Sequence, residues 1–217
     1  MALNKLKFNS INVTPAASEA IRFNSSANGL ETASAGGNLV KLASTTASSS
    51  SSVSFTSGID STYKEYIFIY NNIHPSANIP MWTFQGSTDG GSSFGVNITS
   101  TTFNAYHAED NSEATFEYSS GGDLAQSTNY QRLLTEVNYA NDGSVSGSLH
   151  LFEPSSTTFV KHFIANSQGM FGPTSNPYSW NMYTAGYFNT TSAIDAIDFK
   201  FSSGNIDSGT ITMYGVS

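Results

Sequence analysis

The stretch Tyr63–Asn72 (YKEYIFIYNN) constrains the fold of this chain more than any other part of the sequence. Tyr66, Phe68 and Tyr70 alternate with two isoleucines, and this period of two is that of a β-strand. Because both sets are apolar, the strand needs cover on both faces and belongs in the middle of a sheet. A second sheet can cover one face. The other cover must come from the N-terminal segment, a long loop or a neighbouring subunit, so this strand indicates assembly.

Strand-like runs recur from residue 38 onward, at spacings near the roughly 8–12 residues typical of sandwiches and barrels. Charged residues make up only 11% of the chain, and its hydroxyl-rich runs with regular aromatics suit half-buried pleated surfaces. We therefore predict an all-β fold, an antiparallel, jelly-roll-like β-sandwich over residues 38–217. Ala47–Phe55 (ASSSSSVSF) is predicted to be a loop followed by an edge strand. The predicted strands are Leu39–Leu42, Val53–Phe55, Glu65–Tyr70, Pro80–Gln85, Val96–Phe103, Ala114–Tyr118, Arg132–Val137, Ser146–Phe152, Thr158–Ile164, Tyr178–Phe188, Ala193–Phe201 and Gly209–Tyr214.

Residues 1–37 are predicted to form an N-terminal arm that contains one short helix. Thr14 suits the N-cap and Pro15 the first helical position, which predicts a helix over Thr14–Arg22. The tetrapeptide Lys7–Ser10 (KFNS) is echoed at Arg22–Ser25 (RFNS). This echo is either chance in a chain rich in Ser and Asn, or a pair of hooks that each set a phenylalanine into a groove on a partner.

The charge balance excludes several classes of partner and site. Sixteen acidic residues against eight basic ones give a net charge of −8, which disfavours nucleic acid and anionic membranes as partners. Residues 1–30 are mildly basic, whereas residues 109–153 carry eight carboxylates against Arg132 alone. Cysteine is absent, which excludes disulfides, thiolate metal sites and cysteine nucleophiles. No apolar run has the length of a signal peptide or a membrane span, so we expect folding in a cytosol.

Two groups of residues are candidate metal ligands. His150 and His162 flank Pro154, and strands paired symmetrically about Ser156 would set them opposite each other on one face. Two ligands are too few for a stable site, so the alternative is a half-buried, hydrogen-bonded pair. The loop with Glu109, Asp110 and Glu113 lacks the spacing of a calcium-binding EF-hand and is predicted to be a solvated acidic loop. We expect no metal and no cofactor.

Catalytic motifs are weak in this sequence. Gly143–Gly147 (GSVSG) resembles a nucleophile elbow, but Val145 occupies the position of the serine. A pair of glycosidase carboxylates depends on the fold and not on spacing, so an enzyme acting on surface polysaccharide stays an alternative. Because no site assembles from the sequence, we expect no enzymatic activity.

Tyr178–Phe188 holds the most aromatic strand. Its alternation places Tyr178, Trp180 and Met182 on one face, and Tyr183 with Tyr187 on the other. Aromatic side chains beside Asn can stack on sugar rings, but they are also typical of a sandwich core or a protein interface. The sequence leaves both interpretations open.

Three stretches resemble virion proteins of tailed bacteriophages, particularly those that infect marine cyanobacteria. They are Gly58–Ser76 (GIDSTYKEYIFIYNNIHPS), Phe84–Phe94 (FQGSTDGGSSF) and Ser202–Val216 (SSGNIDSGTITMYGV). The related phage proteins combine a YxEYxF strand, a StDGG hairpin and a terminal GTIxLYG strand that closes the sheet. This chain has Met213 where Leu is commoner. The resemblance covers roughly residues 55–217 and implies a non-enzymatic building block of the particle.

This resemblance leads to two functional hypotheses for a protein located in the virion. The first is a capsid-associated decoration or cement protein that binds the major capsid protein, other virion proteins and its own copies, with a trimer as the expected oligomer. Its arm would bind partners through Lys5, Lys7, Phe8, Arg22 and Phe23. The second is a receptor-binding module of a tail or head fibre. It would contact host glycan through Tyr178, Trp180 and Tyr183.

Overall fold

The computed structural model describes residues 19–23, 26, 28, 30–34, 39–172 and 175–216. The chain divides into two compact units, Met1–Val40 and Lys41–Ser217. Within the described residues every regular element is a β-strand, and no helix occurs. The strands are β1 (Glu19–Phe23), β2 (Leu30–Ser34), β3 (Leu39–Ser50), β4 (Val53–Phe55), β5 (Glu65–Pro75), β6 (Trp82–Ser87), β7 (Ile98–Ala108), β8 (Ala114–Tyr118), β9 (Gln131–Leu134), β10 (Val145–Phe152), β11 (Lys161–Phe171), β12 (Tyr178–Phe188), β13 (Ala196–Phe201) and β14 (Ile206–Val216).

The N-terminal unit contains an antiparallel hairpin of β1 and β2, in which Phe23 is paired with Leu30. The predicted helix over Thr14–Arg22 is therefore wrong for residues 19–22, which belong to β1; residues 14–18 lie outside the described part of the chain. The physical reason is that so short a helix is marginal in water. The backbone of this segment instead pairs with β2, where Ile21 lies opposite Thr32 and Phe23 lies opposite Leu30.

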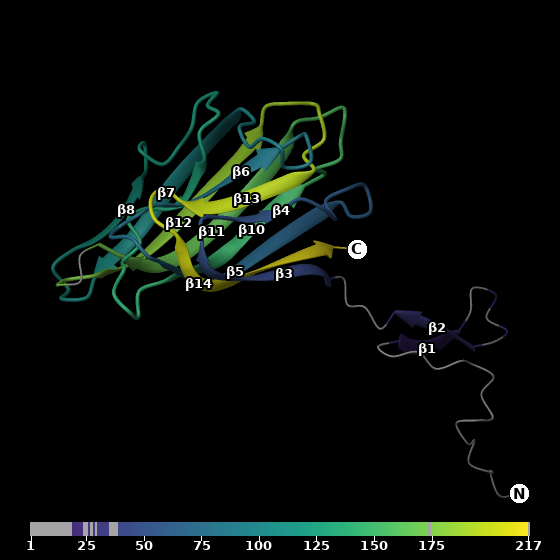
Figure 1. Ribbon diagram of the computed structural model, residues 1–217, viewed down its shortest axis with the longest axis horizontal. Helices are drawn as coiled ribbons and strands as arrows, with labels where there is room; N and C mark the ends of the chain where they lie inside the picture. Colours follow the sequence, from purple (N-terminus) through teal and green to yellow (C-terminus); the bar gives the residue numbers. More distant parts are fainter. Residues whose placement is uncertain are drawn as a thin grey trace, which may run out of the picture. The chain divides into compact units, whose positions relative to one another are not determined.

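Two antiparallel sheets form the larger unit (Figure 1). One sheet has eight strands in the order β3-β14-β5-β10-β11-β12-β7-β8, and the other has four in the order β4-β13-β6-β9. The predicted strands Val53–Phe55, Ala114–Tyr118 and Tyr178–Phe188 are confirmed with their bounds. β4 lies at the edge of its sheet, as predicted, whereas β3 continues as far as Ser50 into the predicted loop.

Strand β5 lies inside the eight-stranded sheet, between β14 and β10, as its two apolar faces predict. Tyr66, Phe68 and Tyr70 have no exposed surface and face the four-stranded sheet, whereas Ile67 and Ile69 on the opposite side are only partly buried. We call this opposite side the outer face of the eight-stranded sheet. One of the two covers that the sequence requires is therefore the second sheet.

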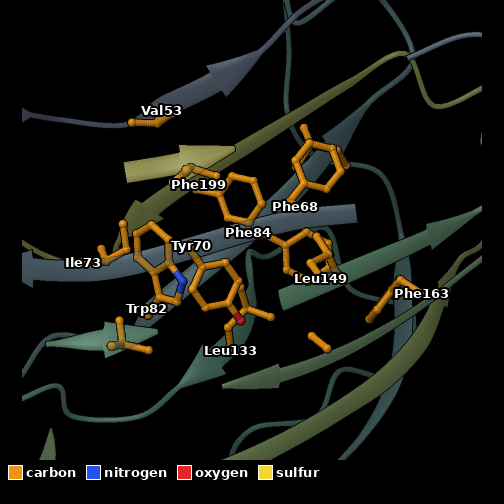
Figure 2. Packing of buried hydrophobic residues seen from close by; sticks show 14 of the residues in the cluster. Val53, Phe68, Tyr70, Ile73, Trp82, Phe84, Leu133, Leu149, Phe163 and Phe199 are labelled. Carbon is orange, nitrogen blue, oxygen red and sulfur yellow. The ribbon is translucent and has the colours of Figure 1, made fainter. Parts of the chain in front are cut away.

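Aromatic rings join the two sheets in the core (Figure 2). Phe199 of β13 has no exposed surface, and its ring stacks on Trp82 of β6 with centroids 5.8 Å apart. It also contacts Phe68 of β5, at 5.6 Å, across the interface between the sheets. Such a continuous set of buried rings fixes how the layers pack, because aromatic pairs prefer definite stacked or edge-to-face geometries.

The segment between β8 and β10 covers the inner face of β7, β11 and β12. Ser100 Oγ donates a hydrogen bond to Gln131 Oε1 at 2.6 Å, and Thr102 Oγ1 donates to the Ser119 carbonyl at 2.6 Å. Asn138 Nδ2 donates to the Gly172 carbonyl at 2.8 Å. Strand β9 of the four-stranded sheet and the loops on either side of it therefore satisfy buried polar groups on this face.

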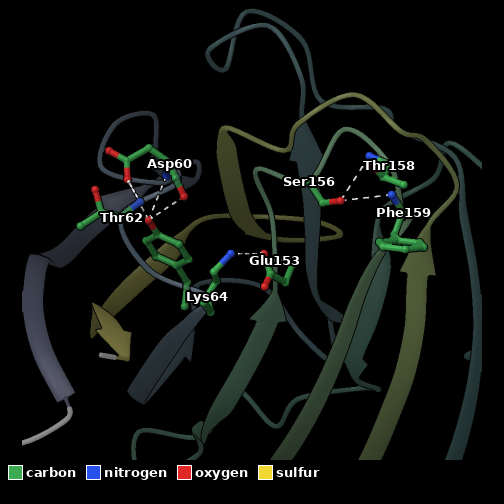
Figure 3. Close-up of polar contacts among 8 residues, drawn as sticks. Asp60, Thr62, Lys64, Glu153, Ser156, Thr158 and Phe159 are labelled. Carbon is green, nitrogen blue, oxygen red and sulfur yellow. Dashed lines mark hydrogen bonds and ion pairs between the residues drawn. The ribbon is translucent and has the colours of Figure 1, made fainter.

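The turns at one end of the eight-stranded sheet are held by polar contacts (Figure 3). Tyr66 Oη donates to the Asp60 carbonyl at 3.0 Å, and Lys64 Nζ lies 3.1 Å from Glu153 Oε2. The Ser156 hydroxyl accepts hydrogen bonds from the backbone N–H groups of Thr158 and Phe159. The β10–β11 connection therefore has a defined conformation, which sets the register of these two strands.

Candidate interaction surface

The outer face of the eight-stranded sheet is a candidate functional surface built from side chains that alternate outward along six neighbouring strands. Cross-strand pairing aligns these side chains in rows. One row consists of Ile67, His150, Ile164, Ala185 and Thr101. The next row consists of Ile69, Ser148, Asn166, Tyr183, Phe103 and Tyr118.

Four aromatic residues form what we call the ridge: Phe103, Phe116, Tyr118 and Tyr183. Their exposed fractions are 37%, 71%, 56% and 43%, respectively. The rings of Phe103 and Tyr183 stack with centroids 5.0 Å apart, and Phe116 contacts Phe103 edge-on at 5.6 Å. The ridge is thus a preassembled cluster of large rings in contact with solvent, and such clusters mark interaction sites more often than scattered single residues do.

A hollow of about 460 Å³ lies beside the ridge. Phe152, His162, Ile164 and Tyr187 line it together with the small residue Ala185. Ala185 is paired with Ile164 on one side and with Thr101 on the other, so its short side chain leaves a depression between larger neighbours. The lining is mainly carbon, which suits an apolar side chain of a partner.

Few charges occur on the outer face. Among the outward positions of β5, β10, β11, β12, β7 and β8, Glu65 is the only acidic residue, and no position holds Lys or Arg. Its Oε1 atom lies 2.6 Å from Nδ1 of His150, so the carboxylate already has a partner. Asn166 and Asn181 exchange hydrogen bonds through their side-chain amides at 3.1 and 3.3 Å. An otherwise acidic protein therefore presents one nearly uncharged side.

The predicted aromatic residues are divided between two environments. Tyr183 lies on the outer face, whereas Trp180 is 7% exposed on the opposite side. The indole ring of Trp180 stacks on Tyr106 and Phe171, with centroids 4.1 and 4.0 Å apart. Trp180 thus belongs to the core, and Tyr178 packs against its edge. The predicted division of this strand into two aromatic faces agrees with the pattern of burial.

The acidic loop between β7 and β8 connects to this aromatic cluster. Glu113 accepts hydrogen bonds from the hydroxyl groups of Tyr106, at 3.1 Å, and Tyr178, at 3.4 Å. Desolvation and the negative charge of Glu113 raise the pKa of Tyr178 above its ordinary value. Asp110 accepts a hydrogen bond from the backbone N–H of Ser112. Over the described residues, no group of three or more His, Cys, Asp or Glu side chains is placed to hold a metal.

The predicted opposition of His150 and His162 is wrong. Strand pairing places Ile164 opposite His150, so the register differs by two residues from one centred on Ser156. His162 is consequently a diagonal neighbour on the same face. The imidazole of His150 is bonded to Glu65 instead.

The arm residues predicted to bind partners are only partly described. Phe23 is 73% exposed, and Ile21 and Leu30 of the same hairpin are also exposed. Arg22 lies in β1 in register with Glu31 of β2. Lys5, Lys7 and Phe8 lie outside the described residues.

Sequence reasoning did not select Phe103, Phe116, Tyr118 and Ile164. The available signal was the alternation in Ile98–Tyr118, but the face that stays uncovered depends on strand order.

No family model, curated protein or solved structure matches this chain. No helix of the described residues is long and apolar enough to cross a membrane.

Proposed function

We propose that this chain is a structural protein of a tailed-bacteriophage virion, a capsid-associated decoration protein that binds the shell and neighbouring subunits without catalysing a reaction. The observation that carries the proposal is the order of eight strands. With the hairpin partners β7, β8, β11 and β12 set aside, the two sheets read β3-β14-β5-β10 and β4-β13-β6-β9. In chain order the strands cross from one sheet to the other at every step except that from β6 to β9. This connectivity matches the pattern expected of a jelly roll, a fold used by viral capsid and lectin domains, and it supports the proposal.

The three stretches that resemble phage virion proteins support the same proposal. Gly58–Ser76 contains β5, Phe84–Phe94 contains the end of β6, and Ser202–Val216 contains β14. β5 and β14 are hydrogen-bonded neighbours, with Ile67 in register with Tyr214. The similar segments therefore belong to central strands of both sheets, where they specify the fold and not only a surface feature.

The exposed apolar groups agree with a role in binding other proteins. The ridge and the hollow lie on one side of the body, and Phe23 is exposed in the hairpin of the arm unit. Apolar surface in contact with water is retained where a partner covers it. A short arm that docks on a neighbour is a common way to join repeated subunits.

The proposal is tested by adding purified protein to particles assembled without it and measuring co-sedimentation. The full-length chain should bind, whereas a chain lacking residues 1–30 should stay folded but lose binding, because the body keeps its own core. Circular dichroism provides the control for folding. Binding that persists without residues 1–30 would contradict the role of the arm, and a full-length chain that does not bind would contradict the decoration function.

A receptor-binding module of a fibre is the second candidate, and the exposed ring of Tyr183 beside Phe103 favours it. Stacked rings next to the amides of Asn166 and Asn181 have the chemistry that sugar rings bind. A glycan array distinguishes the two candidates. A receptor-binding module should bind at least one glycan, and the Tyr183→Ala variant should lose this binding. A decoration protein should show no such binding.

A further inference from the structure

We propose that the outer face of the eight-stranded sheet binds a second copy of this chain, with ridge side chains of one copy entering the hollow of the other. This inference deepens the proposed function and rests on it, since it names a contact that neighbouring copies of a decoration protein would make. It names the surface, the partner and the side chains that make the contact.

The distribution of charge over the body argues for a second copy as the occupant. The net charge of −8 makes two copies repel each other wherever their acidic surfaces approach. Across the outward positions of six strands, Glu65 is the one carboxylate, and it is paired with His150. The outer face is therefore a side on which two identical acidic bodies can meet without burying unpaired like charges, whose cost opposes association.

The size of the face is close to what a stable contact needs. Six strands about 4.8 Å apart make the face about 29 Å wide, and about seven residues at about 3.3 Å each make it about 23 Å long. The flat area of the face is therefore roughly 650 Å². Side-chain relief adds to this flat estimate. A standard protein interface buries about 800 Å² per partner, so pairing through this face is large enough to be specific.

The shapes on the face are complementary to each other. Tyr183 of the ridge and Ala185 of the hollow are two residues apart on β12, which is about 6.6 Å along the strand. In a two-fold symmetric contact, which makes a dimer and not the trimer expected from the sequence, residue i of one copy meets residue j of the other and the reverse holds. A symmetry axis between these positions would bring Tyr183 of each copy over Ala185 of its neighbour, where Ile164 and Tyr187 form apolar walls.

The experiment measures the mass of the full-length protein by sedimentation equilibrium over a range of concentrations. The wild type should self-associate, and Tyr183→Glu and Ile164→Glu should each raise the dissociation constant at least about tenfold, because a carboxylate would be buried in the contact. Tyr139→Glu is the matched control. The exposed fraction of Tyr139, 46%, is close to the 43% of Tyr183. Because Tyr139 lies outside the sheet, its variant should associate like the wild type. Urea unfolding of all four proteins verifies that each is folded.

A wild type that stays monomeric at the highest concentration would overturn the inference, as would an equal effect of Tyr139→Glu. The inference would also be overturned if the wild type were monomeric and Tyr183→Glu abolished its binding to glycan or particles. The outer face would then bind a different partner. Particle binding by a monomeric wild type would leave the decoration function intact. Self-association without particle binding would contradict the decoration function alone.

Discussion

Replacing Phe199 with Ala should destabilise the body more than most other single changes, because its ring connects the two sheets. Phe199 has no exposed surface. Its centroid lies between 5.6 and 6.4 Å from those of five aromatic residues: Phe55, Phe68, Tyr70, Trp82 and Phe84. These neighbours come from β4, β5 and β6, whose backbones are fixed by ladder hydrogen bonds. The surroundings therefore cannot close around a missing ring.

The magnitude follows from the transfer and cavity contributions. Loss of the buried ring costs about 2 kcal/mol of transfer free energy. A remaining cavity on the order of 100 Å³ costs about 2.4 kcal/mol at about 24 cal/mol per Å³. The free energy of unfolding should thus fall by about 4–5 kcal/mol. For a domain of about 150–250 residues each kcal/mol lowers Tm by about 2–4 °C, so a decrease of roughly 13 °C is expected.

Urea unfolding followed by tryptophan fluorescence and by circular dichroism measures this change. Phe159→Ala is the control, because Phe159 is 71% exposed and its loss should change stability by less than about 0.5 kcal/mol. If Phe199→Ala cost less than about 1 kcal/mol, or no more than the control, the two sheets would not pack over this ring. The description of the core would then be refuted.

Three further predictions concern single side chains. Tyr70→Phe leaves the buried hydroxyl of Ser167 without its partner, so urea unfolding should show a loss of about 1–2 kcal/mol; no loss would contradict this hydrogen bond. Gly147→Ala places a methyl group against the backbone oxygen of Asn166, and a soluble variant with wild-type Tm would contradict the close β10–β11 pairing. Hydrogen bonds from Ser87 and Ser93 lower the pKa of Asp89 to about 2, so its contribution to stability is present above about pH 4 and is lost as the pH falls towards 2. Asp89→Asn should therefore flatten the pH dependence of unfolding in this interval, and an unchanged slope would contradict these hydrogen bonds.

Local alternation made much of the fold predictable. β12 was predicted with its bounds because aromatic and polar residues alternate through Tyr178–Phe188. β3 was predicted too short, because its second half is mostly Ser and Thr. The structure explains this half by hydroxyl pairs across to β14, where Ser44 Oγ lies 2.8 Å from Thr212 Oγ1 and Ser49 Oγ donates to Asp207 at 3.0 Å. Such partners are more than 150 residues away in sequence, so no local pattern reveals them.

The candidate site was less predictable, because it depends on register and strand order. Tyr183 was selected from its own strand, but its contact with Phe103 exists because β12 pairs with β7. The His150–His162 prediction failed for a similar reason. The turn contains Glu153 with a φ of 45°, and its conformation shifts the pairing so that Ile164 lies opposite His150. A two-residue shift keeps both imidazoles on one face but separates them.

Quantitative mass spectrometry of purified phage particles tests the central claim most directly. If the chain is a decoration protein, its peptides should be present in the particle at a number in the hundreds, comparable to that of the major capsid protein. A few dozen copies or fewer would contradict the decoration function and favour a fibre. Complete absence from particles whose major capsid protein is detected would contradict a structural role in the virion.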